Sequence, residues 1–307
     1  MDYTKLGRTE IEVSRIVFGC WELGGGMWEK AEDEINIKAI QTAFENGITT
    51  FDTAEGYGNG HSEEVTGMAL QGKRKECVIA TKVSKGNLKP ADLRRAIEKS
   101  LQMLQTDYID IYYIHWPNPE IPLAETLSEM NKLKAEGLIR AIGVSNFSFT
   151  QLQEALTYTQ IDVIQPEYSL LQRDIEKEIL PFCLKNSIGI MSYSSIAKGI
   201  LTGAFHLGQA KMKEDDFRRT RRLFLPEHLE KETELILLLK AIADAKKATL
   251  SQIAINWSLR QKGLTSAIVG TQSEKHLIEN IQASGVKLSP AELSDLDRIS
   301  RKVIASL

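Results

Sequence analysis

Short apolar runs rich in β-branched and aromatic residues alternate along this chain with longer amphipathic stretches. This rhythm is typical of strands that alternate with helices. Eight runs have the composition of buried strands, at 15–19, 48–52, 77–83, 109–115, 139–145, 162–167, 189–194 and 265–271. Helices are predicted between them, among others at 32–47, 90–105, 122–137 and 249–263.

Near-continuous apolar strands separated by helices indicate a parallel sheet that is buried on both faces. Eight such units in one undivided chain favour an α/β fold of the (β/α)8 TIM-barrel type over an open, doubly wound sheet. We therefore expect one domain over residues 1–307, with extra helices toward the C-terminus. Residues 1–14 are predicted to form a β-hairpin that caps the barrel floor. The stretch 195–230 is long and irregular, as functional or mobile loops often are.

Composition narrows the class of protein without naming a function. The 307 residues are 42% hydrophobic and 26% charged, with a net charge of −3, so nothing suggests a nucleic-acid partner. The basic segment 217–222 is more simply explained as a solvated loop. Three cysteines without a CxxC spacing argue against disulfides and zinc. No apolar run is long enough to span a membrane, and residues 1–10 do not resemble a signal peptide, so a cytoplasmic protein is expected.

Polar side chains follow several of the predicted strands where each apolar run ends. Asp52 ends one strand, Tyr57 follows it, Lys82 lies near the end of the next strand, and His115 ends the one after that. Each residue alone has an ordinary explanation: a helix cap, a loop aromatic, a solvated lysine and a core histidine. Together they are more informative, because a barrel brings the carboxyl ends of its strands to one face, where its chemistry takes place.

These four side chains are suited to protonating an oxygen. A free tyrosine has a pKa of about 10, and a nearby ammonium lowers it. Lys82 can supply that charge, Asp52 can hold Lys82, and His115 can bond to the phenol or the substrate oxygen. The sequence shows no nucleophile elbow and no metal-ligand spacing. The pattern therefore predicts a general acid paired with hydride transfer from a nicotinamide.

A site for the dinucleotide is less obvious. The glycine-rich stretch 23–28 lacks the GxGxxG spacing, so we do not expect a Rossmann fold. In 266–280 a strand ends in Gly-Thr and a helix follows Ser273, whose N-terminus could bind phosphate. An ordinary capped helix explains this stretch equally well.

At this point the sequence resembles the aldo-keto reductases over nearly its whole length. The motifs are FDTAEGYGNGHSEE, ATKV, YIHWP, GLIRAIGVSNF, QPEYS, YSSIAKGILTG and VGTQSEKHLIEN, in this order. Among these, the chain is most similar to bacterial reductases related to potassium-channel β subunits. The resemblance implies an NAD(P)-dependent oxidoreductase that reduces an aldehyde or ketone, or oxidises an alcohol or sugar.

The resemblance also assigns residues. It implies a catalytic tetrad of Asp52, Tyr57, Lys82 and His115, with Tyr57 as general acid and base. It implies a substrate pocket walled by Trp21 and Trp116, and Trp28 adds to its aromatic character. It implies cofactor contacts from Gly19, Cys20, Trp21, Asp52, Ser145, Asn146, Gln165, Tyr193, Ser194, Ile196, Ala197, Gly199, Arg218, Gly270, Gln272, His276, Glu279 and Asn280.

Four positions depart from the family pattern. Ser195 stands where relatives usually have proline, and Cys20 where many have threonine. Gln272 stands where a lysine or arginine often binds the 2′-phosphate of NADP, and His276 is a weaker cation than arginine. Since glutamine cannot pair with phosphate as a guanidinium does, NADP is the expected cofactor but NAD is possible.

Two other functions remain open at this stage. A Schiff-base lyase would use Lys82 as its nucleophile. A regulatory subunit would bind the cofactor with little turnover, and we expect it less because no extra segment precedes the hairpin. The sequence does not identify the small-molecule substrate, a carbonyl compound or an alcohol, or the direction of the reaction. We expect a monomer or homo-oligomer.

Overall fold

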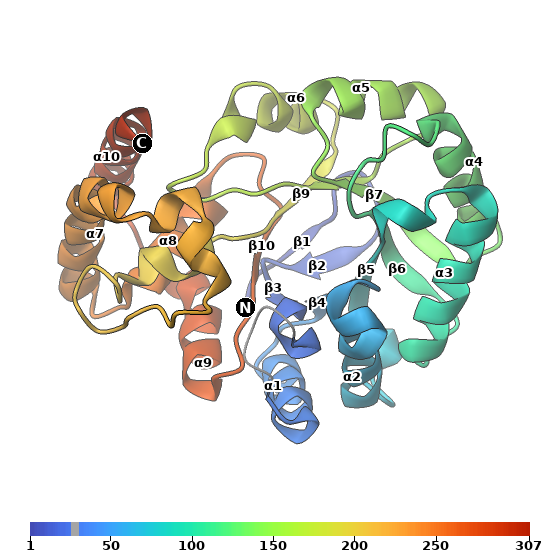
Figure 1. Ribbon diagram of the computed structural model, residues 1–307, viewed down its shortest axis with the longest axis horizontal. Helices are drawn as coiled ribbons and strands as arrows, with labels where there is room; N and C mark the ends of the chain where they lie inside the picture. Colours follow the sequence, from blue (N-terminus) through green and yellow to red (C-terminus); the bar gives the residue numbers. More distant parts are fainter. Residues whose placement is uncertain (26–30) are drawn as a thin grey trace.

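The computed structural model describes residues 1–25 and 31–307. Eight parallel strands close into a barrel in the order β10-β3-β4-β5-β6-β7-β8-β9, surrounded by helices (Figure 1). The strands are β3 (Ile16–Gly19), β4 (Thr50–Asp52), β5 (Val78–Val83), β6 (Ile109–Ile114), β7 (Ile139–Ser145), β8 (Val163–Gln165), β9 (Gly189–Ser192) and β10 (Ser266–Val269). The predicted (β/α)8 barrel is confirmed.

Burial on both faces explains why these runs form parallel strands. Every residue of the eight strands is buried except Arg140, so alternate side chains point into the barrel and toward the helices. Several strands are shorter than predicted. For example, β8 ends at Gln165, because Pro166 has no N–H group to continue a ladder.

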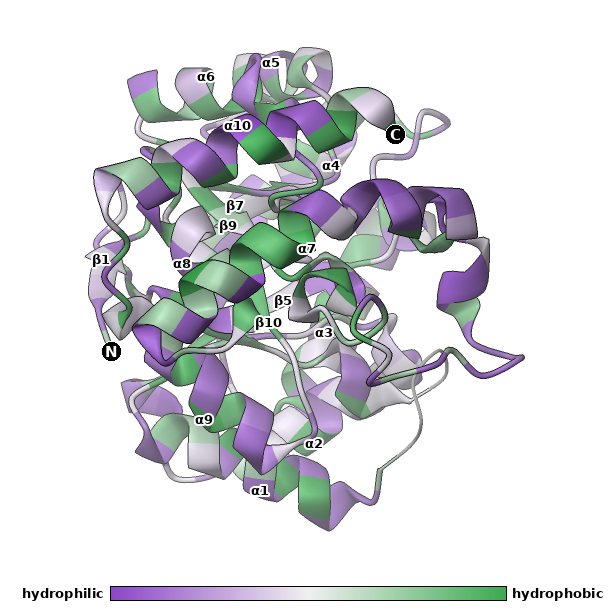
Figure 2. Ribbon diagram, turned by 90° about the vertical axis from the view of Figure 1, so that its left-hand side faces the viewer, coloured by the Kyte–Doolittle hydropathy of each residue, from purple (hydrophilic) through white to green (hydrophobic). Residues whose placement is uncertain are grey.

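A ring of helices, most of them amphipathic, covers the barrel. It consists of α1 (Asp33–Glu45), α2 (His61–Ala69), α3 (Pro90–Met103), α4 (Leu123–Ala135), α5 (Phe149–Tyr158), α6 (Ile179–Lys185), α8 (Leu250–Arg260) and α9 (Glu274–Gln282). Along many of these helices the colour in Figure 2 alternates between hydrophilic and hydrophobic. The four helices predicted by range are present, with ends within three residues of the predicted ones.

Two further helices lie outside this repeat. They are α7 (Pro226–Lys246) and α10 (Pro290–Ser306), which pack on each other and share an ion pair of 3.0 Å between Lys246 and Glu292. The expected extra helices are therefore present. The irregular stretch is shorter than predicted and ends at Leu225, because Pro226 begins α7, a position that proline favours. Within it are three 3₁₀ turns, η6 (Ala197–Thr202), η7 (Phe217–Thr220) and η8 (Arg222–Phe224).

The predicted hairpin closes one end of the barrel. Strands β1 (Tyr3–Lys5) and β2 (Glu12–Ser14) pair antiparallel, and β2 leads directly into β3. The buried side chains of Leu6, Ile11 and Val13 belong to the same apolar cluster as the inward-facing residues of the barrel. The hairpin thus plugs the amino-terminal ends of the strands and leaves the carboxyl ends for chemistry.

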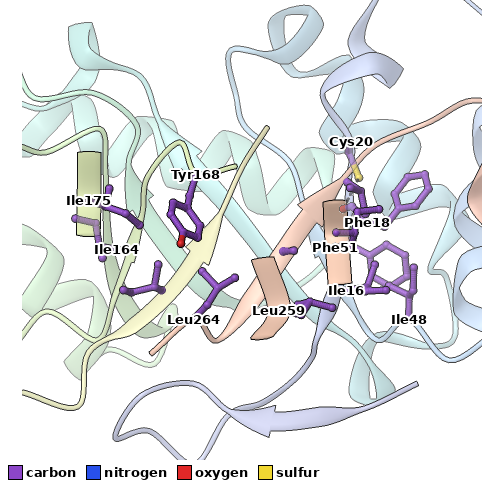
Figure 3. Close-up of a cluster of buried hydrophobic side chains, with 14 of the residues drawn as sticks. Ile16, Phe18, Cys20, Ile48, Phe51, Ile164, Tyr168, Ile175, Leu259 and Leu264 are labelled. Atoms are coloured by element: carbon purple, nitrogen blue, oxygen red, sulfur yellow. Dashed lines mark hydrogen bonds between the residues drawn. The ribbon is translucent and has the colours of Figure 1, made fainter. Parts of the chain in front are cut away.

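A second, larger apolar cluster lies between the strands and the helices. Figure 3 shows part of it, where Phe18 and Phe51 from neighbouring strands lie together and Cys20 follows Phe18. The two rings are 6.2 Å apart between centroids. Cys20 is buried just after the carboxyl end of β3, and its N–H donates to the carbonyl of Asp52, the last residue of β4, at 2.8 Å. None of the helices in the described residues has the length and apolar content needed to cross a bilayer.

Candidate active site

Three of the four candidate catalytic side chains form one hydrogen-bonded group at the carboxyl ends of β4 and β5. The Lys82 amine donates to Asp52 Oδ1 at 2.6 Å, to the Thr53 carbonyl at 2.7 Å and to the Tyr57 hydroxyl at 3.2 Å. Lys82 is completely buried and Asp52 is 3% exposed. The convergence expected from the strand ends is therefore present in the fold, and Asp52 acts as a counter-ion rather than as a helix cap.

Burial and charge act in opposite directions on this group. Burial disfavours the Lys82 ammonium, but Asp52 and Tyr57 outweigh it and raise the pKa of Lys82. Burial likewise raises the pKa of Tyr57, and the Lys82 charge reduces this rise without reversing it. The pKa predicted from the sequence lay below the usual value, and that prediction is wrong in direction. Burial of the phenol outweighs the effect of the ammonium.

His115 completes the group from the end of β6. Its ring lies edge-on to that of Tyr57, with 5.6 Å between centroids. Burial and then the Lys82 charge lower the pKa of His115 to about 3. The imidazole is therefore neutral at physiological pH, and a neutral ring can donate one hydrogen bond to a carbonyl oxygen.

Close backbone packing fixes the turn that carries Tyr57. Tyr57 begins the 3₁₀ turn η2 (Tyr57–Gly60), where Gly58 has a φ of 60°. A Cβ atom added to Gly58 would lie 2.3 Å from the Gly24 carbonyl oxygen, so the two segments touch through their backbones. Only glycine allows this approach. The segment η1 (Trp21–Gly24) is thereby held against the phenol.

Glu55 is a further residue of the site, which was not predicted from the sequence. Its carboxylate accepts hydrogen bonds from the Ser84 N–H at 2.5 Å and from the Asn87 side chain at 3.0 Å. It therefore ties the turn before Tyr57 to the loop after β5. Its position between Asp52 and Tyr57, in a turn with no other acid, is the signal that could have identified it.

A second hydrogen-bonded group lies across the barrel mouth, at the ends of β7, β8 and β9. The Ser145 hydroxyl donates to the Gln165 carbonyl at 2.8 Å, and the Asn146 amide donates to the His115 carbonyl at 2.9 Å. The Tyr193 hydroxyl donates to Asn146 Oδ1 at 2.7 Å. Asn146 has a φ of 61°, which is rare for a non-glycine residue and is often found at binding sites. These are the residues that the resemblance assigns to the nicotinamide.

The turn after β9 has an unusual backbone. Positive φ values occur at Ser194 (56°), Ala197 (49°), Lys198 (52°) and Gly199 (103°). Such left-handed positions can present backbone groups to an anion. Arg218 reaches this turn: its Nη1 donates to the Lys198 carbonyl at 3.3 Å, and Asp216 orients the guanidinium. The structure thus brings Arg218 to Gly199, as the pyrophosphate assignment requires, with Ile196 half-buried in the same turn.

The candidate adenosine end lies between β3, β10 and α9. Gly19 and Gly270 touch there, since a Cβ atom on Gly270 would lie 2.7 Å from the Gly19 carbonyl oxygen. The Gln272 amide donates to the Glu22 carbonyl at 3.2 Å and lies 3.4 Å from Asn36 Oδ1. The Ser273 side chain caps α9, where the sequence left a phosphate site and an ordinary capped helix equally open. Three further predicted residues lie on α9, where His276 is exposed, Glu279 half-buried and Asn280 buried.

The two candidate substrate walls differ in their surroundings. The Trp21 ring lies 6.4 Å from that of Tyr57 and 5.9 Å from that of Phe217, measured between centroids. Trp116, at the rim after His115, is 50% exposed. Trp28 lies outside the described residues, as do Gly26 and Met27 of the glycine-rich stretch. The Phe217 contact was not predicted, because nothing in the sequence relates it to Trp21.

These observations fit a nicotinamide dinucleotide. Three features follow one another around the barrel mouth. They are the hydrogen-bonded group around Asn146, the left-handed turn that Arg218 reaches, and the contact between Gly19 and Gly270. In the described parts of the chain, no cluster of three or more His, Cys, Asp or Glu side chains could hold a metal ion. The three cysteines are buried and free.

Comparison with known proteins agrees with this picture. The sequence profile described as the Aldo/keto reductase family matches residues 15–301. The chain is 35% identical to Aldo-keto reductase YhdN of Bacillus subtilis (strain 168), over 99% of this chain and 95% of that protein. It is 36% identical to an NADH-specific methylglyoxal reductase of Escherichia coli (strain K12), over 94% of each chain.

A solved structure extends the comparison to three dimensions. A crystal structure of an aldo/keto reductase from Klebsiella pneumoniae, in complex with NADP and acetate, matches with a TM-score of 0.77 and 33% identity. The match covers 95% of this chain and 93% of that one. Likeness in sequence and in fold therefore extends over almost the whole chain.

Proposed function

Because the chain belongs to the aldo/keto reductase family, and is an NAD(P)-dependent oxidoreductase acting on aldehydes or ketones, we propose that Tyr57 is its general acid. The supporting observation is the contact of 3.2 Å between the Tyr57 hydroxyl and the buried Lys82 amine.

The proposed mechanism follows from the charges of the group. A bound nicotinamide supplies hydride to the carbonyl carbon. Tyr57 holds its proton at neutral pH, because burial raises the pKa of its phenol. It gives this proton to the carbonyl oxygen, and the Lys82 ammonium stabilises the phenolate that remains. In the reverse direction the phenolate accepts the proton of an alcohol.

Asp52 and His115 support this step in different ways. Asp52 keeps Lys82 charged and directed at the phenol, through the bond of 2.6 Å. His115 is neutral, so its ring can orient the carbonyl oxygen by a hydrogen bond without competing as an acid. The hydrogen-bonded group around Asn146 would hold the nicotinamide end of the cofactor. The turn after β9, with Arg218, would hold the pyrophosphate.

The geometry disfavours the lyase alternative. A Schiff-base lysine needs a neutral amine with a free electron pair. Lys82 instead donates three hydrogen bonds, and its raised pKa keeps it charged. No observation favours a regulatory subunit. A cytoplasmic location stays a prediction, as does a monomer or homo-oligomer.

Replacing Tyr57 with phenylalanine tests the proposal. We expect Tyr57→Phe to lose about 10²–10⁴-fold in kcat, the usual range for a general acid, since the ring remains and only the proton donor is lost. Turnover is followed by NAD(P)H absorbance on a panel of aldehydes, ketones and sugars that includes methylglyoxal. Cofactor affinity, measured by fluorescence quenching, should be retained.

Tyr193→Phe is the matched control, because it removes a hydroxyl from another tyrosine at the same barrel mouth. It should weaken cofactor binding more than it lowers kcat. Near-normal turnover by Tyr57→Phe on a substrate that the unaltered enzyme reduces would show that another group is the acid.

A further inference from the structure

Gln165 makes a hydrogen bond that its expected role does not require. It ends β8, is 3% exposed, and its Nε2 donates to Asp52 Oδ2 at 2.7 Å. Strands β4 and β8 are four positions apart in the ring of eight, so they lie on opposite sides of the barrel. The bond therefore crosses the barrel and joins the candidate cofactor group to the candidate catalytic group.

This bond completes the coordination of the Asp52 carboxylate. Oδ1 accepts from Lys82 at 2.6 Å and Oδ2 accepts from Gln165 at 2.7 Å. With both oxygens held, the carboxylate cannot rotate away from Lys82. The site is buried, so water cannot readily replace the Gln165 donor, and a buried charge that loses a donor is destabilised.

The same residue is tied to the nicotinamide side through its backbone. The Gln165 carbonyl accepts from the Ser145 hydroxyl, and the Asn146 amide lies 3.1 Å from that hydroxyl. Tyr193 in turn donates to Asn146. A continuous series of hydrogen bonds thus runs from Tyr193 after β9 through Gln165 and Asp52 to Lys82 and the Tyr57 hydroxyl.

We propose that Gln165 is a positioning residue for proton transfer, which acts through Asp52 and Lys82 on Tyr57. This role is additional to any contact with the cofactor, and it rests on the proposed function of Tyr57. It predicts that removing the amide lowers the rate of chemistry even when the cofactor is saturating. A residue that only holds the nicotinamide would instead raise the cofactor KM.

The first test is Gln165→Leu, compared with Gln160→Leu. Gln160 is an exposed residue near the other end of β8, whose amide also donates to an aspartate, Asp162 Oδ1 at 2.8 Å. At saturating cofactor, Gln165→Leu should lower kcat about tenfold to a hundredfold, the range expected for losing a hydrogen bond to a buried charge. Gln160→Leu should leave kcat unchanged. An unaltered kcat in Gln165→Leu would overturn the proposal.

A double-mutant cycle identifies the path of the effect. In Asp52→Asn, the amide oxygen can stay with Lys82, and the NH₂ group that faces Gln165 cannot accept its bond. If Gln165 acts through Asp52, adding Gln165→Leu to Asp52→Asn should lower kcat little further. If the two losses multiply, Gln165 acts on the cofactor alone and the proposal is wrong.

The bond itself can be tested without turnover. Urea unfolding is measured without cofactor on the unaltered protein, on Gln165→Leu and Asp52→Asn, and on the double variant. Gln165→Leu should destabilise the otherwise unaltered chain more than it destabilises the chain that already carries Asp52→Asn. Equal destabilisation in both backgrounds would overturn the proposal. If the unaltered enzyme turned over no carbonyl at all, the proposed function would fail instead, and this cycle would still report on the bond.

Discussion

At the scale of single residues, the charge of Lys82 affects both of its aromatic neighbours. It opposes the rise in the pKa of Tyr57, and after burial it is the second cause of the low pKa of His115. The phenol is therefore made more acidic than burial alone would leave it, while the imidazole is kept neutral. The Lys82 ammonium thus gives its two neighbours different roles. Tyr57 can donate a proton, and the neutral His115 ring can donate a hydrogen bond.

Gln272 gives the residue-scale prediction on cofactor choice. Gln272→Arg should lower the Kd of NADPH about tenfold or more, because a guanidinium can pair with a 2′-phosphate and an amide cannot. The Kd of NADH should change little, since it has no phosphate at that position. Fluorescence titration of both cofactors measures the two values.

Gln272→Leu is the control for this prediction, because it also removes the bonds to Glu22 and Asn36 but adds no charge. If arginine tightened NADH and NADPH equally, residue 272 would not face the 2′ position.

The sequence identified the four catalytic candidates because each stands at or just after a strand end, and barrel geometry then requires them to meet. It could not give the direction of the Tyr57 pKa, which depends on how deeply the fold buries the phenol. It also could not give the bond between Gln165 and Asp52. Those residues are 113 positions apart, and amide orientation depends on side-chain packing.

At the scale of elements, α2 packs on β5 through a buried acid. Glu63 is 1% exposed, and the Thr81 hydroxyl donates to its Oε1 at 2.6 Å. Its other oxygen has no hydrogen-bond partner among the described residues. Burial, opposed chiefly by the Thr81 hydrogen bond, raises the pKa of Glu63 to about 7. The helix is therefore held to the strand by an acid that is neutral below this pH.

This predicts how Glu63 contributes to stability as the pH changes. The unfolded chain releases the Glu63 proton near the reference value of 4.5, whereas the folded chain keeps it to about 7. The contribution of Glu63 is therefore most favourable below 4.5 and declines as the pH rises to 7, by on the order of 3 kcal/mol. Glu63→Gln stays neutral, so it should be more stable than the unaltered protein at pH 8 and nearly equal at pH 4.

Urea unfolding at several pH values measures this difference. Glu64→Gln is the matched control, because Glu64 is the next residue of α2 and its side chain is 44% exposed. A stability gain for Glu63→Gln that did not vary between pH 4 and pH 8 would mean that Glu63 is ionised in the fold.

Element boundaries show where local sequence information is sufficient. Pro166 ends β8 and Pro226 begins α7 for reasons that lie in the proline itself, and both could be predicted. The carboxyl end of β10 could not be predicted in this way. The strand ends before Gly270, where the backbone of that residue meets Gly19. That contact joins residues from opposite ends of the chain, so only the closed barrel reveals it.

At the scale of the whole molecule, the barrel separates stability from chemistry. The hairpin fills the amino-terminal end with apolar side chains, while the polar groups of Asp52, Lys82 and Gln165 lie at the carboxyl end. A barrel interior is a packed core, so a change at its floor alters the free energy of unfolding more than it alters the geometry of the mouth.

Leu6→Ala tests this separation. Leu6 is completely buried between the hairpin and the barrel floor, so truncation should cost about 2–5 kcal/mol in the free energy of unfolding. The kcat of the folded enzyme should stay unchanged, because the catalytic groups lie at the other end of the strands. Leu184→Ala removes the same atoms from α6, where Leu184 is 44% exposed, and should change stability by less than about 0.5 kcal/mol.

The same urea curves test whether residues 1–307 are one domain, since a single domain should lose the hairpin and the barrel in one transition. Two transitions would show that the hairpin and the barrel unfold separately. A fall in the kcat of Leu6→Ala without loss of stability would show that the barrel floor affects the catalytic groups at the mouth.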